Sequence, residues 1–243
     1  MTNKIRTDIK PGGHVQDRLH AEKSKTGLSV VRPVRLLYND QLTDGVFLLG
    51  FRRDFSFEAG QIIGIAMDAG GPRRLYSICS GEEENEIKIL YNVVNDGLLT
   101  PGLSDLGEGS TIWITEPRGS FVASPGPAVW IATGTGIAPF YSMMRSGLAE
   151  DKLLIHGERY PERFHFHNEF SKVHGDKYIR CCTTKQDESY FPGRVTDFLR
   201  ETERLDPGLK YYLCGRTEMV VEARDILISR GVPYEHIISE IYF

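Results

Sequence analysis

The sequence lacks long apolar runs, an excess of positive charge and a signal-like N-terminus. No run of apolar residues approaches the ~20 that cross a bilayer, so we expect no membrane partner. The formal net charge is −4, which argues against a general nucleic-acid binder. Residues 1–27 are polar, carry mixed charge and lack the apolar core of a signal peptide. We expect this segment to be frayed or disordered, and the protein to be cytoplasmic.

Metal-binding patterns are also missing. The four cysteines stand at Cys79, Cys181, Cys182 and Cys214. None forms a C-x-x-C pair, so zinc and iron–sulfur ligation lack their usual spacing, and a reducing compartment fits best. His165, His167 and His174 are close in sequence, but no carboxylate or cysteine completes a ligand set with them. We therefore expect no metal, and partly exposed histidines.

Residues 28–123 alternate short strand-like runs with Gly, Asn and Asp turns. The predicted strands are Ser29–Leu37, Gly45–Phe51, Gln61–Met67, Arg74–Ser77, Glu86–Val94 and Ser110–Thr115. Six short strands in fewer than a hundred residues predict an antiparallel six-stranded β-barrel. One helix is expected over Pro101–Leu106, with Thr100 as its N-cap and the proline in its first turn.

Residues 124–243 have a different period, in which strands and helices alternate. The predicted strands are Ala128–Thr133, Lys152–His156, Tyr178–Thr183 and Lys210–Cys214. The predicted helices are Pro139–Arg145, Phe164–Val173, Arg194–Glu203 and Glu218–Arg230, the last with Thr217 as N-cap and Gly231 as terminator. This alternation predicts a second, α/β domain with a parallel sheet and ligands at the carboxyl ends of its strands. We place the domain boundary near Ser124.

A glycine loop, Thr133–Phe140, joins the first of these strands to its helix. Glycines let the backbone approach an anion, and the N–H groups of a helix start favour negative charge, so the loop can cradle a phosphate. However, Pro139 stands where the Gly-x-Gly-x-x-Gly fingerprint has its last glycine. A tight turn that binds nothing is the alternative.

The run Arg74-Leu75-Tyr76-Ser77 combines a cation, an aromatic ring and a hydroxyl in one strand. One interpretation is a flat polar ligand, with Arg74 on a phosphate, Tyr76 on a planar ring and Ser77 on a heteroatom. The other is an edge strand with exposed polar residues, which strand propensity permits. The run alone does not decide between them.

Several motifs together resemble the ferredoxin–NADP reductase family, in its bacterial, FAD-containing form. With the glycine loop they cover roughly residues 28–243, in the order and spacing of that family. They are Phe57–Gln61, Arg74–Ser77, Gly97–Thr100, Pro117–Phe121, Tyr212–Gly215 and Glu240–Phe243. In that family the glycine loop ends in Ala-Pro, and it serves the nicotinamide nucleotide while the barrel holds the flavin.

The resemblance implies an FAD cofactor, NADP(H) as substrate, and a separate ferredoxin or flavodoxin as electron partner. Hydride passes between NADPH and the flavin, and single electrons pass between the flavin and the partner. The residues implied in catalysis are Ser77, Cys214, Glu240 and Tyr242. Those implied in cofactor binding are Arg74, Leu75, Tyr76, Ser77, Tyr91, Val93, Gly97, Leu99, Thr100, Thr133, Gly134, Thr135, Gly136, Arg159, Thr183, Thr184, Arg194, Cys214, Gly215, Tyr242 and Phe243.

One departure from the family concerns the 2′-phosphate of NADP. Where relatives place Ser-Arg after the third strand, this chain has Thr183-Thr184-Lys185, and lysine does not offer the fork of an arginine. Arg159 and Arg194 are similar to bacterial residues around that phosphate. An acid that selects NAD is absent unless Glu158 serves, so we expect NADP over NAD.

Two other functions keep the same fold. The acceptor of electrons can be free flavin or a small oxidant, or the chain can be a flavin electron-transfer subunit of a larger complex. No cysteine cluster or ferredoxin module follows the nucleotide domain, so we expect a separate acceptor. A ferredoxin is acidic, and Arg52, Arg53, Arg73 and Arg118 are the candidates for its docking, with scattered solvated charge as the alternative.

Overall fold

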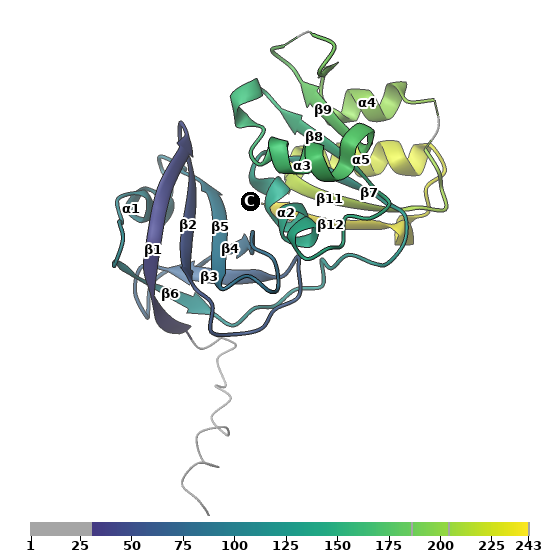
Figure 1. Ribbon diagram of the computed structural model, residues 1–243. Coiled ribbons are helices and arrows are strands. Elements are labelled where there is room, and N and C mark those ends of the chain that lie inside the picture. Colours follow the sequence, from purple (N-terminus) through teal and green to yellow (C-terminus); the bar gives the residue numbers. More distant parts are fainter. Residues whose placement is uncertain (1–30, 186, 204, 243) are drawn as a thin grey trace, which may run out of the picture. The chain divides into compact units, whose positions relative to one another are not determined.

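The computed structural model describes residues 31–242 apart from Gln186 and Arg204 (Figure 1). Within the described range, residues 31 onward form one compact unit that contains two six-stranded sheets. The N-terminal segment 1–27 and Phe243, for which the sequence makes predictions, lie outside the described residues. No helix in the described part of the chain has the length and apolar character needed to cross a membrane.

The first sheet is antiparallel and runs in the order β4-β3-β6-β1-β2-β5. Its strands are β1 (Val31–Thr43), β2 (Val46–Arg52), β3 (Ile62–Ala66), β4 (Arg74–Ser77), β5 (Glu86–Asn92) and β6 (Thr111–Thr115). A bridge between Ile78 and Ile89 joins its two edges, β4 and β5. The predicted six-stranded antiparallel barrel is therefore confirmed. Alternate residues fill its interior, among them Ile63, Ile65 and Ile87, which are fully buried.

The short helix of the barrel, α1 (Thr100–Ser104), begins earlier than predicted. Its N-cap is Leu99, and no side chain caps it. The predicted cap, Thr100, is inside the helix, and its hydroxyl accepts a 2.9 Å hydrogen bond from the amide of Val94. The N-cap prediction is wrong because the hydroxyl stabilises the preceding turn instead of the helix end.

The second sheet is parallel, in the order β10-β9-β8-β7-β11-β12. Its strands are β7 (Ala128–Thr133), β8 (Lys152–Glu158), β9 (Tyr178–Cys182), β10 (Phe191–Pro192), β11 (Lys210–Arg216) and β12 (Ile237–Tyr242). Its helices are α2 (Ala138–Arg145), α3 (His167–His174), α4 (Val195–Glu201) and α5 (Thr217–Ser229), of which α2 and α3 pack on one face and α4 and α5 on the other (Figure 1). The predicted α/β architecture is confirmed.

The sequence analysis also missed two strands and misplaced a second cap. β10 is only two residues long. No strand was predicted over β12, which pairs in parallel with β11 over six residues. The N-cap of α5 is Arg216 and not Thr217, and Gly231 follows the helix with a φ of 90°. The predicted boundary at Ser124 falls in the segment between β6 and β7 and remains a prediction.

The histidine prediction is wrong for two of three residues. His165 and His174 are only 8% and 7% exposed. His174 lies edge-on to the ring of Trp130, and its Nδ1 is 3.1 Å from the carbonyl of Lys152, so neighbouring elements replace its water. His167 is half-buried. Among the described residues no cluster of three or more potential ligands forms a metal site.

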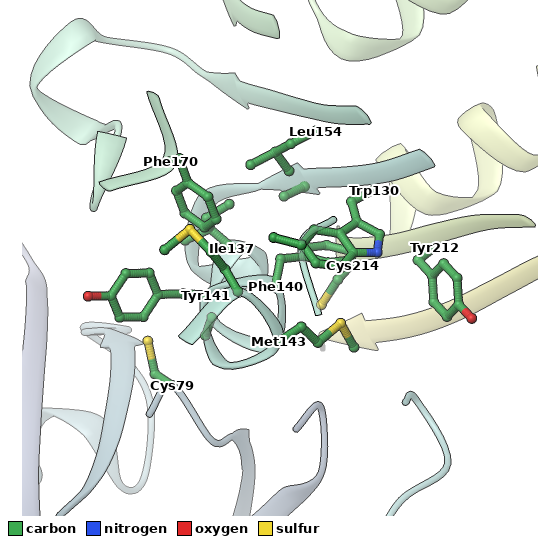
Figure 2. Close-up of a cluster of buried hydrophobic side chains, with 14 of the residues drawn as sticks. Cys79, Trp130, Ile137, Phe140, Tyr141, Met143, Leu154, Phe170, Tyr212 and Cys214 are labelled. Atoms are coloured by element: carbon green, nitrogen blue, oxygen red, sulfur yellow. The ribbon is translucent and has the colours of Figure 1, made fainter. Parts of the chain in front are cut away.

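One hydrophobic core extends across both sheets. It joins Val46, Cys79 and Leu90 of the barrel to residues of β7 and α2. Figure 2 shows Cys79 next to α2, which contributes Phe140 and Tyr141 to this core. The two sheets therefore bury apolar side chains in one common core, and a linker is not the only part of the chain that joins them.

Candidate active site

The centre of the candidate site is a contact between the barrel and the last strand of the parallel sheet. The hydroxyl of Ser77, at the end of β4, donates a 2.6 Å hydrogen bond to Oε2 of Glu240 in β12. The register of β11 and β12 pairs Glu240 with Cys214, so their side chains project from the same face. Three of the four residues predicted to act in catalysis are thus brought together. The backbone of the fourth, Tyr242, pairs with Arg216 in the same ladder.

Glu240 is electrostatically unusual. Its burial raises the pKa of the carboxyl group above the ordinary glutamate range, and the hydrogen bond from Ser77 opposes this only in part. Ser77 itself is 2% exposed. A carboxyl group held in this way keeps its proton to a higher pH than an exposed glutamate, which suits a group that gives or takes a proton.

Three side chains of β4 are exposed or half-buried, with Arg74 and Tyr76 on one face of the strand and Leu75 on the other. Arg74 and Leu75 are exposed, and Tyr76 is half-buried, with its ring edge-on to Tyr91 at 6.3 Å. Tyr91 is buried, and its hydroxyl donates to Asn39, so this ring supports Tyr76 from within the barrel. Unlike most large apolar residues, Leu75 is 49% exposed. Arg74 and Tyr76, which share a face of the strand, suit a flat ligand that carries a phosphate.

The loop after β5 adds further apolar surface to this part of the barrel. Val94 and Leu98 are 57% and 76% exposed, while Leu99 and Thr100 are buried and Val93 is half-buried. The amide of Gly97 donates to the carbonyl of Val94, and a Cβ at Gly97 would lie 2.9 Å from that oxygen. Glycine is therefore required for this tight turn. The exposed leucine and valine fit the flavin that the resemblance implies.

The glycine loop lies at the point where the parallel sheet changes direction. The chain proceeds from β7 outward to β9 and returns through β11 on the other side of β7, which is the position where open sheets bind ligands. The loop forms a 3-10 turn, Gly134–Ile137, before α2. A Cβ at Gly136 would lie 2.4 Å from the carbonyl of Cys214. The loop thus rests directly on the end of β11.

Other features of this loop support a ligand site. Gly134 has a φ of 57°. The hydroxyl of Thr133 is buried without a hydrogen-bond partner in the described part of the chain. A Cβ at Gly215 would lie 2.3 Å from that hydroxyl, so Gly215 too must lack a side chain. Asn92 donates to the hydroxyl of Thr135 at 3.4 Å. The sequence analysis missed Asn92, because only the fold brings β5 to this loop.

The residues predicted around the 2′-phosphate lie after β8 and β9. The hydroxyl of Thr184 donates to the backbone carbonyl of Arg159, so the two loops are tied together. The guanidinium of Arg159 lies 5.2 Å from the ring centre of Tyr160. Arg194, the N-cap of α4, is exposed, as are Thr183 and Thr184. The carboxylate of Glu158 is buried and lies 3.5 Å from Nε2 of His156.

Arg53, one of the predicted docking residues, is half-buried. Its guanidinium donates to the carbonyls of Glu84 and Phe55, at 2.6 and 3.3 Å. Two donors of its cationic group hold the barrel's own loops, and the docking role of Arg53 remains a prediction. Arg52 and Arg118 are exposed, and Arg73 is half-buried.

The antiparallel barrel, the glycine loop and the buried carboxyl group of Glu240 together indicate one class of protein. This class is the oxidoreductases that bring a nicotinamide nucleotide to a flavin. Comparison with known proteins agrees. Residues 130–225 match the oxidoreductase NAD-binding domain family. The ferredoxin–NADP reductase of Azotobacter vinelandii is 30% identical over 72% of this chain and 80% of that protein. The reductase subunit of an aromatic O-demethylase from Amycolatopsis sp. is 27% identical, over 88% of this chain and 77% of that protein.

A solved structure has the same fold over most of this chain. The ferredoxin NADP+ reductase from Neisseria gonorrhoeae, with bound FAD and NADP, superposes with a TM-score of 0.78 at 21% identity, over 89% of this chain and 100% of that chain. The chain belongs to the ferredoxin–NADP reductase family. The sequence-based prediction of an FAD flavoprotein oxidoreductase that uses a nicotinamide nucleotide is thereby confirmed at the level of the family.

Proposed function

We propose that this protein is an NADPH-dependent, FAD-containing reductase that exchanges single electrons with a separate ferredoxin or flavodoxin. The observation that carries the proposal is the hydrogen bond from Ser77 to Glu240, which sets a protonatable carboxyl beside the strand that carries the flavin motif. When bound, FAD supplies hydride acceptance and one-electron release. The chain's own residues bind FAD and the nicotinamide nucleotide, orient them and supply a proton.

On the barrel, Arg74 is the partner for a phosphate, and Leu75 and Tyr76 offer apolar and aromatic surface to a planar ring. The tight turn at Gly97 gives backbone access to the pyrophosphate. Leu98 adds a second exposed apolar surface. The hydroxyl of Ser77 is positioned to hydrogen-bond the reactive edge of the ring.

On the parallel sheet, Gly134 and Gly136 give the pyrophosphate of the nucleotide access to backbone amides. Cys214 and Gly215 lie directly behind this loop, so they face the nicotinamide end. Burial raises the pKa of Glu240, and its carboxyl group accepts the hydrogen bond from Ser77, so we assign it the proton-transfer role. Tyr242 and Phe243 follow Glu240 in the chain and are proposed to cover the flavin, as in the family.

The nucleotide preference is proposed to be NADP. In sheets of this type, an acid after the second strand selects NAD by hydrogen-bonding a ribose hydroxyl. Glu158 holds that position, but its carboxylate is buried against His156. Arg159 and Arg194 are exposed beside it and offer cationic groups for a 2′-phosphate. Thr183 and Thr184 add hydroxyl groups on the neighbouring loop.

A stopped-flow comparison of NADPH and NADH with the purified, FAD-loaded protein tests this proposal. We expect a yellow protein whose flavin is reduced faster by NADPH, and which then reduces an iron–sulfur protein in preference to free FMN. A colourless chain that binds no FAD on titration contradicts the flavoprotein assignment. Faster turnover with free FMN than with ferredoxin would instead favour a flavin reductase.

A further inference from the structure

Helix α2 connects the nucleotide loop to the barrel. It begins directly after the 3-10 turn Gly134–Ile137, so any shift of α2 moves the loop. Its Ser142 donates a 2.6 Å hydrogen bond to the backbone carbonyl of Ser80, three residues beyond Ser77. Both serines are completely buried. The bond therefore joins the element that follows the nucleotide loop to the segment that follows the flavin strand.

We propose that Ser142 is a positioning residue for hydride transfer, which sets the distance between the nucleotide loop and the flavin strand without touching either cofactor. This role rests on the proposed function. It differs from that of the loop glycines and of Ser77, because it acts through the placement of α2. Misplacement of reacting groups by about 1 Å can lower a rate by about a hundredfold.

Neighbouring contacts also hold α2 against the barrel. The hydroxyl of Ser146, one turn along α2, accepts a 3.0 Å hydrogen bond from the amide of Glu82. A Cβ at Gly81 would lie 2.8 Å from the carbonyl of Arg145, so the segment touches the helix backbone itself. Nε of Arg145 lies 2.8 Å from Glu84. The contact thus extends over about one turn at the end of α2, from Ser142 to its C-cap Ser146.

The direction of the Ser142 hydroxyl is the specific evidence for positioning. A serine in a helix can donate to the carbonyl four residues earlier, as Ser146 does to Ser142 at 2.8 Å. Ser142 instead donates across to the barrel. A buried hydrogen bond is directional, whereas the surrounding apolar contacts permit small shifts. Removing the donor would leave the buried carbonyl of Ser80 unsatisfied.

The test compares the FAD-loaded parent with S142A by single-turnover reduction with NADPH. We expect the hydride-transfer rate to fall by about tenfold to a hundredfold. The Kd of NADPH, from the binding phase, should change by less than about threefold, and FAD content should stay equal. The matched control is S229A on α5, whose hydroxyl donates to a helix carbonyl at 2.7 Å and is exposed, and it should keep the parent rate.

A second readout needs no cofactor. In FAD-free protein, amide hydrogen exchange over residues 80–84 and 138–146 should be faster in S142A than in the parent. If S142A does not yield folded protein, S142C takes its place, because a buried thiol keeps the volume and weakens the donor. S142C should then show the slower hydride transfer.

Three outcomes overturn the role. Equal hydride-transfer rates in parent and S142A (or S142C) exclude it. A variant that loses FAD or melts earlier, but whose loaded fraction reacts at the parent rate, shows a purely structural hydrogen bond. Failure of both NADPH and NADH to reduce the parent flavin overturns the proposed function and the role with it. A failure of the proposed function is therefore seen in the parent, whereas a failure of the positioning role alone is seen only in the variants.

Discussion

The hydroxyl of Ser77 donates to the carboxylate of Glu240 at 2.6 Å, although 163 positions separate the two residues. The bond joins β4 of the barrel to β12 of the parallel sheet. Because burial raises the pKa of Glu240, this contact also makes the stability of the protein depend on pH.

Glu240→Gln should remove that dependence. The folded protein holds the Glu240 proton more tightly than the unfolded chain, so the free energy of unfolding falls as pH rises from 4.5 through the raised pKa. E240Q lacks the titrating group and should gain stability relative to the parent over that interval. Urea denaturation at a series of pH values measures the difference. A difference that does not change with pH would contradict the assignment.

His165 should have the opposite effect. Burial, with smaller contributions from His156 and Arg163, lowers its pKa from 6.5 to about 4. The unfolded chain takes up this proton first, so stability is complete above pH 6.5 and is lost as pH falls toward 4. The loss is on the order of 3 kcal/mol at most, at about 1.4 kcal/mol per pKa unit. In H165L the free energy of unfolding should fall less than in the parent between pH 6.5 and 4. H167Q should behave like the parent. A parent-like acid transition in H165L would exclude His165 as the cause.

Gly136→Ala should weaken nucleotide binding and leave the flavin in place. The added Cβ would lie 2.4 Å from the carbonyl of Cys214, which is backbone and cannot rotate away. We expect the Kd of NADPH to rise by about tenfold or more, equivalent to 1.4 kcal/mol. G107A, where a Cβ meets nothing within 4 Å, is the control. Loss of FAD in G136A would show that the loop serves the other cofactor.

Arg52→Glu and Arg53→Glu should differ, although the residues are neighbours. R52E reverses an exposed charge and should raise the KM for an acidic ferredoxin while reduction of a small dye stays unchanged. R53E removes hydrogen bonds to two backbone carbonyls and should cost about 1–3 kcal/mol of stability. Thermal unfolding and steady-state kinetics separate the two. Equal loss of dye and ferredoxin activity in R52E contradicts the docking role.

Arg159→Ala should reduce the discrimination between NADPH and NADH. Its exposed guanidinium is a partner for the 2′-phosphate, which only NADPH carries. We expect the Kd of NADPH to rise by about tenfold to a hundredfold, with that of NADH nearly unchanged. R159K should recover part of the affinity, because lysine keeps the charge without the fork. Parallel loss for both nucleotides would indicate a general effect on the loop.

Local pattern was sufficient for much of the fold. The strand Arg74–Ser77 and the strand Ala128–Thr133 have the predicted bounds, since short runs between turn residues define them. The strand Ile237–Tyr242 was not predicted, because its partner β11 lies more than twenty residues earlier and nothing local indicates the pairing. The sequence predicted the catalytic importance of Glu240 only through the family resemblance.

Burial was the property least accessible from sequence. His165 and His174 are polar by residue type, and only the folded structure shows that they are 8% and 7% exposed. Thr100 was an acceptable N-cap by residue type, yet a backbone amide outside the helix took its hydroxyl. Arg53 was placed with the docking residues for its charge, and its true partners are carbonyls that composition does not reveal.

The apolar core shared by Val46, Leu90, Phe140 and Tyr141 has a practical consequence for protein engineering. Cutting the chain between β6 and β7 would expose this surface on both fragments, so each half should aggregate when expressed alone. Chimeras that exchange the nucleotide half for that of a relative must also exchange the barrel residues facing α2. The smallest transferable module is the whole two-sheet unit.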